Sequence, residues 1–252
     1  MELSGTIAII TGAGGGLGRE IALGLAVAGA GVVIADLDAQ AADETARQVR
    51  QHGVPARAVG ADLRDPEEAY RLVRLAAEDG GPHILVNNAG GWTPDEQFPE
   101  ATPAAWGATM ALNLTIPMLL SQLALKPMRL LGGGAIVNIA SSAGLGDAGY
   151  GSPEYAAGKA GLIRFTSSLA GLEATHGVRM TCVVPGWIGL ERAHAELAAK
   201  PEAERAAMPP LIPPADLVAV VLELIRNGRS GSVVELLRGD QPPRLRPPGP
   251  IT

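Results

Sequence analysis

The stretch Thr6-Ile7-Ala8-Ile9-Ile10-Thr11-Gly12-Ala13-Gly14-Gly15-Gly16-Leu17-Gly18 joins an apolar run to a cluster of glycines. Residues 6–10 predict a buried strand, and residues 17–28 repeat apolar side chains with a helical period. Glycines at such a junction let the backbone approach a pyrophosphate, which is then bound by the free N–H groups of the helix N-terminus. A glycine cluster can also be a plain tight turn, but its position between strand and helix favours a dinucleotide site. The candidate cofactor contacts in this loop are Gly12, Gly14, Gly16, Leu17 and Gly18.

The rest of the chain alternates short apolar runs with longer segments of helical period, a pattern typical of βαβ units and a parallel sheet. We predict strands at residues 6–10, 31–35, 56–59, 84–86, 135–139, 179–184 and 232–236. We predict helices at residues 17–28, 39–51, 66–79, 103–130, 154–176 and 213–226. The pattern indicates an α/β fold with a single dinucleotide-binding and catalytic domain over residues 1–240. A Pro-rich C-terminal tail, residues 241–252, is expected to add little to the core.

Composition and charge exclude several classes of protein. A net charge of −6 and a pI near 5.3 argue against nucleic acid or an anionic membrane surface as a partner. No uninterrupted apolar run reaches the ~20 residues of a membrane span, and the N-terminus has no secretory signal pattern. The one cysteine, Cys182, lies in an apolar run and is expected to be a buried thiol, which suits a reducing cytoplasm. The four histidines are scattered, so no metal site is expected.

Two aspartates extend the cofactor hypothesis. Asp36 ends the second predicted strand, where a carboxylate can accept hydrogen bonds from the adenosine ribose. The same carboxylate would repel a 2′-phosphate, and no basic residue follows at Leu37 or Asp38, so the sequence favours NAD over NADP. A solvated aspartate at a strand end is the alternative. Asp62 and Leu63, after the third strand, are placed to contact the adenine edge.

A second motif indicates acid–base chemistry. Tyr155 and Lys159 are four residues apart, which places a phenol and an ammonium on one face of a helix. A nearby positive charge favours the phenolate, so such a tyrosine could take the proton of a bound alcohol. Isolated pairs of this kind are common on helix surfaces. A hydroxyl after the fifth strand, from Ser142 or its rival Ser141, could hold the substrate oxygen.

Taken together, these motifs resemble the short-chain dehydrogenase/reductase family over about residues 4–237. The glycine loop looks like the family's cofactor loop, and Asn87-Asn88-Ala89-Gly90 looks like its motif after the fourth strand. Pro185-Gly186 resembles its turn near the nicotinamide. The resemblance implies a Rossmann-like, doubly wound parallel sheet of about seven strands with helices on both faces. It also implies a homotetramer or homodimer, with the helices at 103–130 and 154–177 at the seam.

The resemblance assigns roles to individual residues. It implies that Tyr155 is the general acid/base, that Lys159 also binds the nicotinamide ribose, and that Ser142 rather than Ser141 polarises the carbonyl, on the Ser–Tyr spacing. Asn113 matches the helix asparagine that supports a water-linked proton relay. The further cofactor contacts that it implies are Asn88, Ala89, Gly90, Pro185, Gly186 and Ile188. Leu190 departs from the family's frequent threonine after the Pro-Gly turn, which puts one cofactor hydrogen bond in doubt.

The loops around this centre predict a substrate pocket. We expect Trp92, Ser142, Leu145, Tyr150 and Trp187 to line it, although core packing is the alternative for either tryptophan. Residues 190–212 are a candidate lid, with a surface helical excursion as the alternative. The aromatic and apolar residues expected around the pocket favour an apolar or mixed substrate over a small charged one.

The sequence therefore predicts an oxidoreductase that uses NAD to interconvert a secondary alcohol and a ketone. One alternative is an epimerase or dehydratase of the same fold that uses bound NAD transiently. Another is a non-catalytic sensor that binds the dinucleotide and reports redox state to a partner. Such a sensor would be expected to have lost Ser142, Tyr155 or Lys159, and all three are present.

Overall fold

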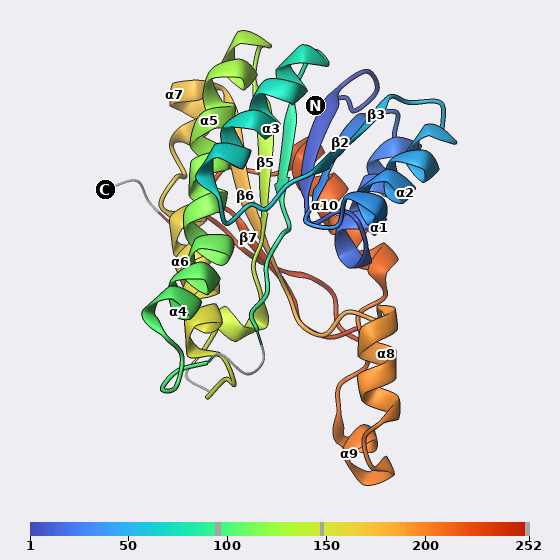
Figure 1. The fold of residues 1–252 in the computed structure, drawn as a ribbon, viewed down its shortest axis with the longest axis vertical. Coiled ribbons are helices and arrows are strands. Elements are labelled where there is room, and N and C mark those ends of the chain that lie inside the picture. Colours follow the sequence, from blue (N-terminus) through green and yellow to red (C-terminus); the bar gives the residue numbers. More distant parts are fainter. Residues whose placement is uncertain (94–96, 147–148, 250–252) are drawn as a thin grey trace.

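The chain folds around one sheet whose strand order is β3-β2-β1-β4-β5-β6-β7-β8 (Figure 1). The computed structural model describes residues 1–93, 97–146 and 149–249. Strands β1 to β7 are parallel, and β8 pairs antiparallel with β7. The strands are β1 (Ile7–Thr11), β2 (Gly31–Asp36), β3 (Ala56–Gly60), β4 (Ile84–Asn87), β5 (Gly134–Ile139), β6 (Val178–Pro185), β7 (Val233–Leu236) and β8 (Arg244–Arg246). The seven predicted strands are confirmed, and the order reverses between β1 and β4, as in a doubly wound sheet.

Helices cover both faces of the sheet (Figure 1). The helices α1 (Gly16–Val27), α2 (Ala39–Arg50) and α10 (Pro214–Asn227) pack over one apolar cluster. On the other face, α3 (Pro66–Glu78) and α5 (Ile116–Leu130) pack over a second cluster. The remaining helices are α4 (Pro103–Met110), α6 (Pro153–Ser167), α7 (Leu172–His176), α8 (Glu191–Ala198) and α9 (Glu202–Ala207). The two cores explain why nearly every sheet strand reads as a continuous apolar run.

Two long predicted helices differ from the structure in detail. The segment 103–130 is α4 and α5 joined by a π-helical turn, Ala111–Thr115. It is long and apolar enough to cross a membrane by length and composition alone, but here it packs against α3 and α6. The predicted continuous helix 154–176 is wrong, because it breaks into α6 and α7. At the break, the hydroxyls of Ser167 and Ser168 both donate to the Arg164 carbonyl, which competes with the helical backbone pattern.

The Pro-rich tail forms the eighth strand, which the sequence analysis did not predict. All three side chains of β8 are exposed, so the tail adds backbone pairing at the sheet edge and leaves the core unchanged. Arg246 also lies 3.2 Å from the buried carboxylate of Glu235 on β7. Residues 250–252 of the predicted tail lie outside the described residues.

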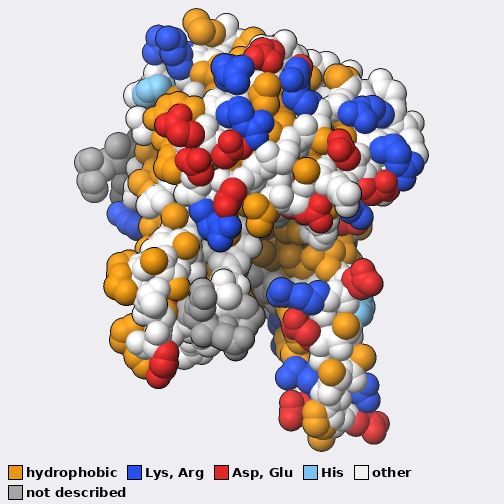
Figure 2. Space-filling model, viewed as in Figure 1, with side chains coloured by type: hydrophobic (Ala, Val, Ile, Leu, Met, Phe, Trp, Pro, Cys, Tyr) orange, Lys and Arg blue, Asp and Glu red, His pale blue; other side chains and the backbone are white. Residues whose placement is uncertain are grey.

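The segment 190–212, predicted as a candidate lid, leaves the main body as the two helices α8 and α9 (Figure 1). At its base, Ile188 forms a parallel bridge with Ile212. The space-filling view shows the surface hollowed between this extension and the lobe that carries α4 and α6 (Figure 2). The carboxyl ends of the parallel strands open toward that hollow, which is where an α/β sheet places its ligands.

A buried chain of polar groups ties α6 to the sheet. The Asn138 side chain on β5 accepts a hydrogen bond from Asn87 Nδ2 at 2.8 Å and donates to Thr166 Oγ1 at 2.9 Å. Thr166 donates in turn to the Leu162 carbonyl at 2.9 Å. Asn138 and Thr166 are fully buried, so each bond replaces water that cannot reach them.

We predict that Thr166→Val destabilises the protein by about 1–3 kcal/mol, because the Asn138 amide is left buried without an acceptor. Urea unfolding followed by circular dichroism measures the change. Thr175→Val, at an exposed position on α7, is the matched control and is expected to change stability by less than ~0.5 kcal/mol. Equal stability of the two variants would contradict the role given to this network.

Candidate active site

The glycine loop after β1 is built for close approach. Gly12 and Gly16 have φ angles of 64° and 52°, in the left-handed region that favours glycine. A Cβ at Gly18 would lie 2.2 Å from the Gly12 carbonyl oxygen, so no larger residue fits there. The α1 helix begins with Gly15 as its N-cap and has no side-chain cap, which leaves its first N–H groups free. The loop therefore has the geometry that the predicted phosphate cradle needs, and Gly16 and Leu17 begin the helix that follows it.

The motif after β4 holds this loop from the neighbouring strand. Asn88 Nδ2 donates to the carbonyls of Thr11 and Gly12, at 2.9 Å and 3.0 Å. The Thr11 hydroxyl oxygen accepts the N–H groups of Asn88 and Ala89, both at 3.0 Å. The two segments lie side by side at the point where the strand order reverses, so the structure brings them together as predicted.

Asp36 lies directly against the loop. Its Oδ2 accepts the Gly14 N–H at 2.7 Å, and its Oδ1 accepts the Asp38 N–H at 3.0 Å. A Cβ at Gly14 would lie 2.8 Å from the Asp36 carboxyl carbon, so this glycine permits the contact. A carboxylate has further lone pairs, so these two bonds leave acceptor capacity for a ribose hydroxyl.

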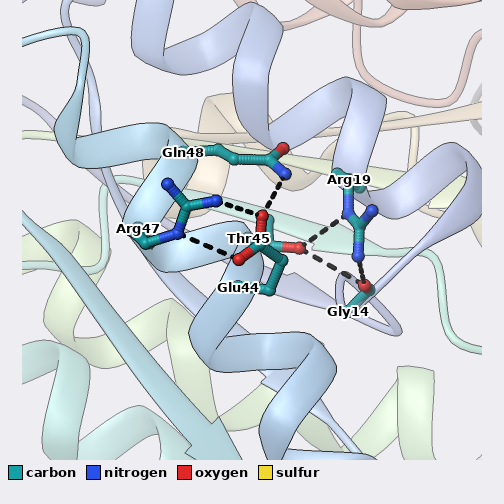
Figure 3. A network of polar contacts seen from close by, with 6 residues as sticks. All are labelled: Gly14, Arg19, Glu44, Thr45, Arg47 and Gln48. Carbon is teal, nitrogen blue, oxygen red and sulfur yellow. Dashed lines mark hydrogen bonds and ion pairs between the residues drawn. The ribbon is translucent and has the colours of Figure 1, made fainter.

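A polar network behind the loop was not predicted from the sequence (Figure 3). The Arg19 guanidinium donates to the Gly14 carbonyl and, at 3.0 Å, to Thr45 Oγ1 on α2. Thr45 is fully buried, and beside it Glu44 binds the Arg47 guanidinium. Arg19 therefore fixes the loop backbone from within. The only sequence signal was a basic residue directly after the last loop glycine.

A cleft of about 520 Å³ runs from the glycine loop toward α4. Asp36 and Leu63 line it, together with Asp62, whose carboxylate is bound by Arg64 at 2.7 Å. The Arg64 side chain lowers the pKa of Asp62 to about 2. The Asp62 carboxylate is thus held by Arg64 at the rim of the cleft. The other lining residues include Gly12, Leu37, Arg64, Asn88, Ala89, Gly90, Gly91, Trp92, Thr93, Thr109 and Leu112.

Asn113 lies in the π-helical turn and is fully buried. Its Oδ1 accepts the Gly91 N–H at 3.1 Å, and its Nδ2 donates to the carbonyls of Gly91 at 2.7 Å and Thr109 at 2.8 Å. A Cβ at Gly90 would lie 2.7 Å from Asn113 Oδ1 and 2.8 Å from Lys159 Nζ. Three predicted site residues from three segments therefore meet at one point.

Ser141 and Ser142 have different surroundings in the structure. Ser141 is half-buried and acts as a hydrogen-bonding neighbour that lowers the pKa of the Tyr155 phenol. Ser142 opens a short 3-10 turn, Ser142–Gly144, and its side chain is exposed. The structure thus favours Ser141 as the neighbour of the phenol, and the role that the Ser–Tyr spacing gives to Ser142 stays a prediction.

Tyr155 and Lys159 lie on one face of α6, as predicted. Lys159 is 3% exposed, donates to the Ile139 carbonyl at 2.9 Å, and its Nζ lies 5.6 Å from the centre of the Tyr155 ring. Burial lowers the pKa of Lys159 to about 8. Burial also raises the pKa of Tyr155, while the Ser141 hydrogen bond and the Arg192 charge act to lower it. Burial is thus the largest influence on the pKa of the phenol, and the effect expected from the Lys159 charge stays a prediction.

Cys182 lies in the core behind this helix, as the sequence indicated. It is fully buried, and burial raises its pKa to about 12, so the thiol stays protonated at neutral pH. Among the described residues, no group of three or more His, Cys, Asp or Glu is arranged to hold a metal ion.

Two aromatic rings lie beside the Tyr155 phenol. Trp92 lies 4.7 Å from Tyr155 between ring centres, and Tyr150 lies 5.7 Å from Trp92 and 5.9 Å from Tyr155. Two of the predicted pocket residues are therefore at the site. Leu145 differs, because it packs against the small apolar cluster of Ala140, Ile163, Cys182, Val184 and Val233.

The turn after β6 connects the sheet to the base of the extension α8–α9. Pro185 is buried at the strand end, and a Cβ at Gly186 would lie 2.2 Å from the Leu237 carbonyl oxygen. The Trp187 carbonyl accepts the Ile212 N–H at 2.8 Å, so Trp187 and Ile188 fasten the base of the extension. Leu190 occupies the position where the family often has a threonine. One of its methyl groups lies 3.8 Å from the position that a Cβ at Gly16 would take, so the side chain packs beside the glycine loop.

The sequence matches the short chain dehydrogenase family over residues 6–200. The chain belongs to this family. It is therefore a short-chain dehydrogenase/reductase that acts on CH–OH groups, as its curated relatives are.

Several individual relatives of this short-chain dehydrogenase are similar over most of their length. The cis-4-hydroxycyclohexanecarboxylate dehydrogenase of Sinomonas cyclohexanicum is 40% identical over 72% of each chain. The D-beta-hydroxybutyrate dehydrogenase of Cupriavidus necator is 37% identical over 74% of this chain and 72% of its own. A solved 7 alpha-hydroxysteroid dehydrogenase, in complex with NADH and 7-oxo glycochenodeoxycholic acid, superimposes with a TM-score of 0.83. That enzyme is 32% identical, and the match covers 95% of both chains.

The buried ammonium of Lys159 predicts a specific pH dependence of stability. Its pKa is about 8 in the folded chain against an ordinary 10.5, so between these values the unfolded chain binds more protons and stability rises with pH. Lys159→Met lacks this contribution. The stability of the wild type relative to that variant is expected to rise by about 2 kcal/mol from about pH 7 to about pH 9.5.

Chemical denaturation of both proteins at the two pH values measures this difference. Lys126→Met, which removes a lysine from α5 whose side chain is not fully buried, serves as the control and is expected to follow the wild type. A constant difference between wild type and Lys159→Met would mean that the ammonium is not desolvated as described.

Proposed function

We propose that this short-chain dehydrogenase interconverts a secondary alcohol and a ketone with NAD, using Tyr155 as its general acid/base. The observation that carries the proposal is the convergence of the Tyr155 phenol, the Ser141 hydroxyl and the Lys159 ammonium beside the hollow at the carboxyl edge of the sheet. A phenol that is hydrogen-bonded to a second hydroxyl can share a substrate oxygen with it and move one proton.

The residues present fit a bound dinucleotide. The free N–H groups of α1 suit a pyrophosphate, and Gly12, Gly14 and Gly18 leave no side chain in its way. Asp36 would accept hydrogen bonds from the adenosine ribose, and Lys159 would donate to the nicotinamide ribose. When bound, the nicotinamide supplies the carbon that accepts or donates the hydride.

The charge at the adenosine end supports NAD over NADP. Asp36 places a carboxylate there, and the nearest described basic side chains are already engaged. Arg19 is bonded to the Gly14 carbonyl and Thr45, Arg47 to Glu44, and Arg64 to Asp62. A 2′-phosphate would meet the Asp36 charge without a free guanidinium in compensation.

The proton steps follow from the side-chain positions. In alcohol oxidation, Ser141 holds the substrate hydroxyl and Tyr155 takes its proton as the hydride leaves the carbinol carbon. In ketone reduction, the Tyr155 phenol donates that proton to the carbonyl oxygen. We assign the hydroxyl role to Ser141 because it lowers the pKa of the Tyr155 phenol, whereas Ser142 is exposed. Both N–H groups of the Asn113 amide are bonded to backbone carbonyls and its oxygen accepts the Gly91 N–H, so we propose that Asn113 acts by fixing the backbone around the site.

The walls of the site favour a substrate with an apolar body. Trp92 and Tyr150 offer aromatic faces next to the phenol. Arg192 on α8 is paired with Glu196 at 3.1 Å, and the two charges shift the pKa of Tyr150 in opposite directions, so the support for an acidic group on the substrate comes from the relatives. The related enzymes named for a hydroxycyclohexanecarboxylate and a hydroxybutyrate act on hydroxy acids. We therefore place hydroxy acids, cyclic ones included, first among the candidate substrates.

The extension α8–α9 is proposed to cover the substrate, because it flanks the hollow and begins at the Ile188 turn (Figures 1 and 2). We also propose a homodimer or homotetramer that forms through the long helices. Trp106 and Met118 on that segment are 43% and 38% exposed, and Leu130 is 77% exposed, so these apolar side chains would be covered in such an assembly. The buried, protonated thiol is compatible with the reducing cytoplasm that we propose as its compartment.

The experiment is a steady-state assay of NADH formation with NAD and NADP over a panel of secondary alcohols, with hydroxy acids, cyclic alcohols and steroids included. We expect turnover with NAD at a kcat/KM at least ~10-fold above that with NADP, since one unfavourable charge contact is worth a factor of that order. Tyr155→Phe should lower kcat by roughly 100- to 10,000-fold, because it removes the acid/base group.

The two serines provide the internal control. Ser141→Ala should lower kcat by roughly 10- to 1,000-fold, since it removes a hydroxyl that holds the developing charge. Ser142→Ala should stay within about twofold of wild type, because we assign the contact with the substrate oxygen to Ser141 and the Ser142 side chain is exposed. The reverse order of the two variants would return the role to Ser142. Tight NADH binding with no turnover on any alcohol would favour the sensor hypothesis.

A further inference from the structure

Glu154, the residue before the reactive tyrosine, is a buried carboxylate that the proposed chemistry does not use. Its side chain is 9% exposed, although glutamate is normally a surface residue. It occupies the second position of α6, after the N-cap Ser152 and Pro153. A buried carboxylate needs specific hydrogen bonds to offset the loss of water, so its partners indicate its role.

The carboxylate joins two segments that are distant in sequence. Glu154 Oε1 accepts the backbone N–H of Phe98 at 2.7 Å, and Oε2 accepts the Ser152 hydroxyl at 3.5 Å. Ser152 Oγ in turn accepts the Tyr155 N–H at 3.3 Å. The Phe98 side chain is 66% exposed, so the contact is to its backbone. A charge-assisted bond of this length is among the stronger hydrogen bonds in proteins.

A comparison within the chain separates this contact from an ordinary helix-start effect. Helix α3 begins with Asp65, Pro66 and Glu67, the same order of cap, proline and glutamate as in α6. Both glutamates gain from the positive end of the helix dipole. Glu67 is exposed, whereas Glu154 is turned inward onto Phe98. The dipole therefore does not account for the burial of Glu154.

Residues 91–93 line the cleft, and the Gln97 side chain donates to the Thr93 carbonyl, which links them to the segment that Glu154 holds. We call residues 91–93 and 97–102 the wall segment. It is fixed at Gly91 by Asn113 and again at Phe98 by Glu154. Trp92 lies near the first of these points, with its ring 4.7 Å from that of Tyr155. Adjacent residues of α6, Glu154 and Tyr155, thus contact the backbone and the tryptophan of the same wall segment.

We propose that Glu154 is a positioning residue that holds the wall segment against the start of α6 and so sets the shape of the substrate pocket. Its contacts are all on the substrate side, since the glycine loop and Asp36 are bound by other residues. Its loss therefore acts on substrate binding and leaves dinucleotide binding unchanged. The kinetic part of this inference depends on the proposed function, while the structural part does not.

The test compares Glu154→Ala, Glu154→Asp and Glu154→Gln in the full chain, with Glu67→Ala as the matched control. Glutamine keeps an acceptor at the same reach, whereas aspartate keeps the charge but is one methylene too short. We expect the amide of Phe98 to exchange with deuterium at least ~10-fold faster in the Ala and Asp variants, because no side-chain acceptor then reaches that N–H. We expect the Gln variant and the Glu67 control to exchange like the wild type.

The kinetic readouts should separate in the same way. KM for the alcohol is expected to rise about 10-fold in the Ala and Asp variants, with kcat within about threefold and the NADH dissociation constant within about twofold. The Asp and Gln variants carry the comparison if the Ala variant does not fold.

Three results would overturn the inference. The first is unchanged exchange at Phe98 in the Asp variant. The second is equal losses in Gln and Asp, which would mean that the charge or the exact side chain matters rather than the tether. The third is a parallel loss of NADH affinity. If no alcohol is turned over by any variant, the proposed function fails, and the exchange measurement still decides the role of Glu154.

Discussion

The site depends on one crowded point, where Gly90 contacts both Asn113 and Lys159. The close approach is possible because Gly90 has no Cβ, which would lie 2.7 Å from Asn113 Oδ1 and 2.8 Å from Lys159 Nζ. Each contacting residue comes from a different element: the loop after β4, the π-helical turn and α6. The Asn113 amide then spans Gly91 and Thr109, so the loop cannot move without breaking buried hydrogen bonds. This point fixes the position of the tyrosine helix relative to the sheet.

The cofactor side is linked to the same loop. Asn88 and Ala89 hydrogen-bond to the Thr11 hydroxyl at the end of β1, and Asn88 also bonds to the Gly12 carbonyl in the glycine loop. Gly90, the next residue, lies at the crowded point. A single short segment after β4 therefore sets the distance between the phosphate cradle and the Tyr155 phenol. Hydride transfer needs the nicotinamide and the reacting carbon in van der Waals contact, so this distance has to be held closely. The buried Asn87–Asn138–Thr166 chain supports the arrangement from below by tying α6 to the strands.

Much of this arrangement was predictable from the sequence, because strand ends and helix starts carry strong signals. The apolar runs predicted the seven parallel strands, and Asp36 followed from where the second run ends. Tyr155 and Lys159 followed from their helical spacing, and Asn88 and Asn113 from the family resemblance. Features that depend on packing were not predictable. Spacing alone chose Ser142, whereas in the structure Ser141 lowers the pKa of the phenol. The break after Ser167, the pairing of β8 and the inward turn of Glu154 each come from contacts between distant segments. No local pattern encodes them.

The most direct test of the account is the transfer of deuterium from a labelled alcohol. A hydroxy acid or other secondary alcohol with deuterium on the carbinol carbon is incubated with NAD and the protein, and the NADH formed is analysed by mass spectrometry. If this site transfers a hydride, NADH accumulates carrying the label and the ketone is released. Label that returns to the substrate with inverted configuration would indicate an epimerase. Bound dinucleotide with no label transfer from any alcohol would contradict the central claim that this site moves a hydride.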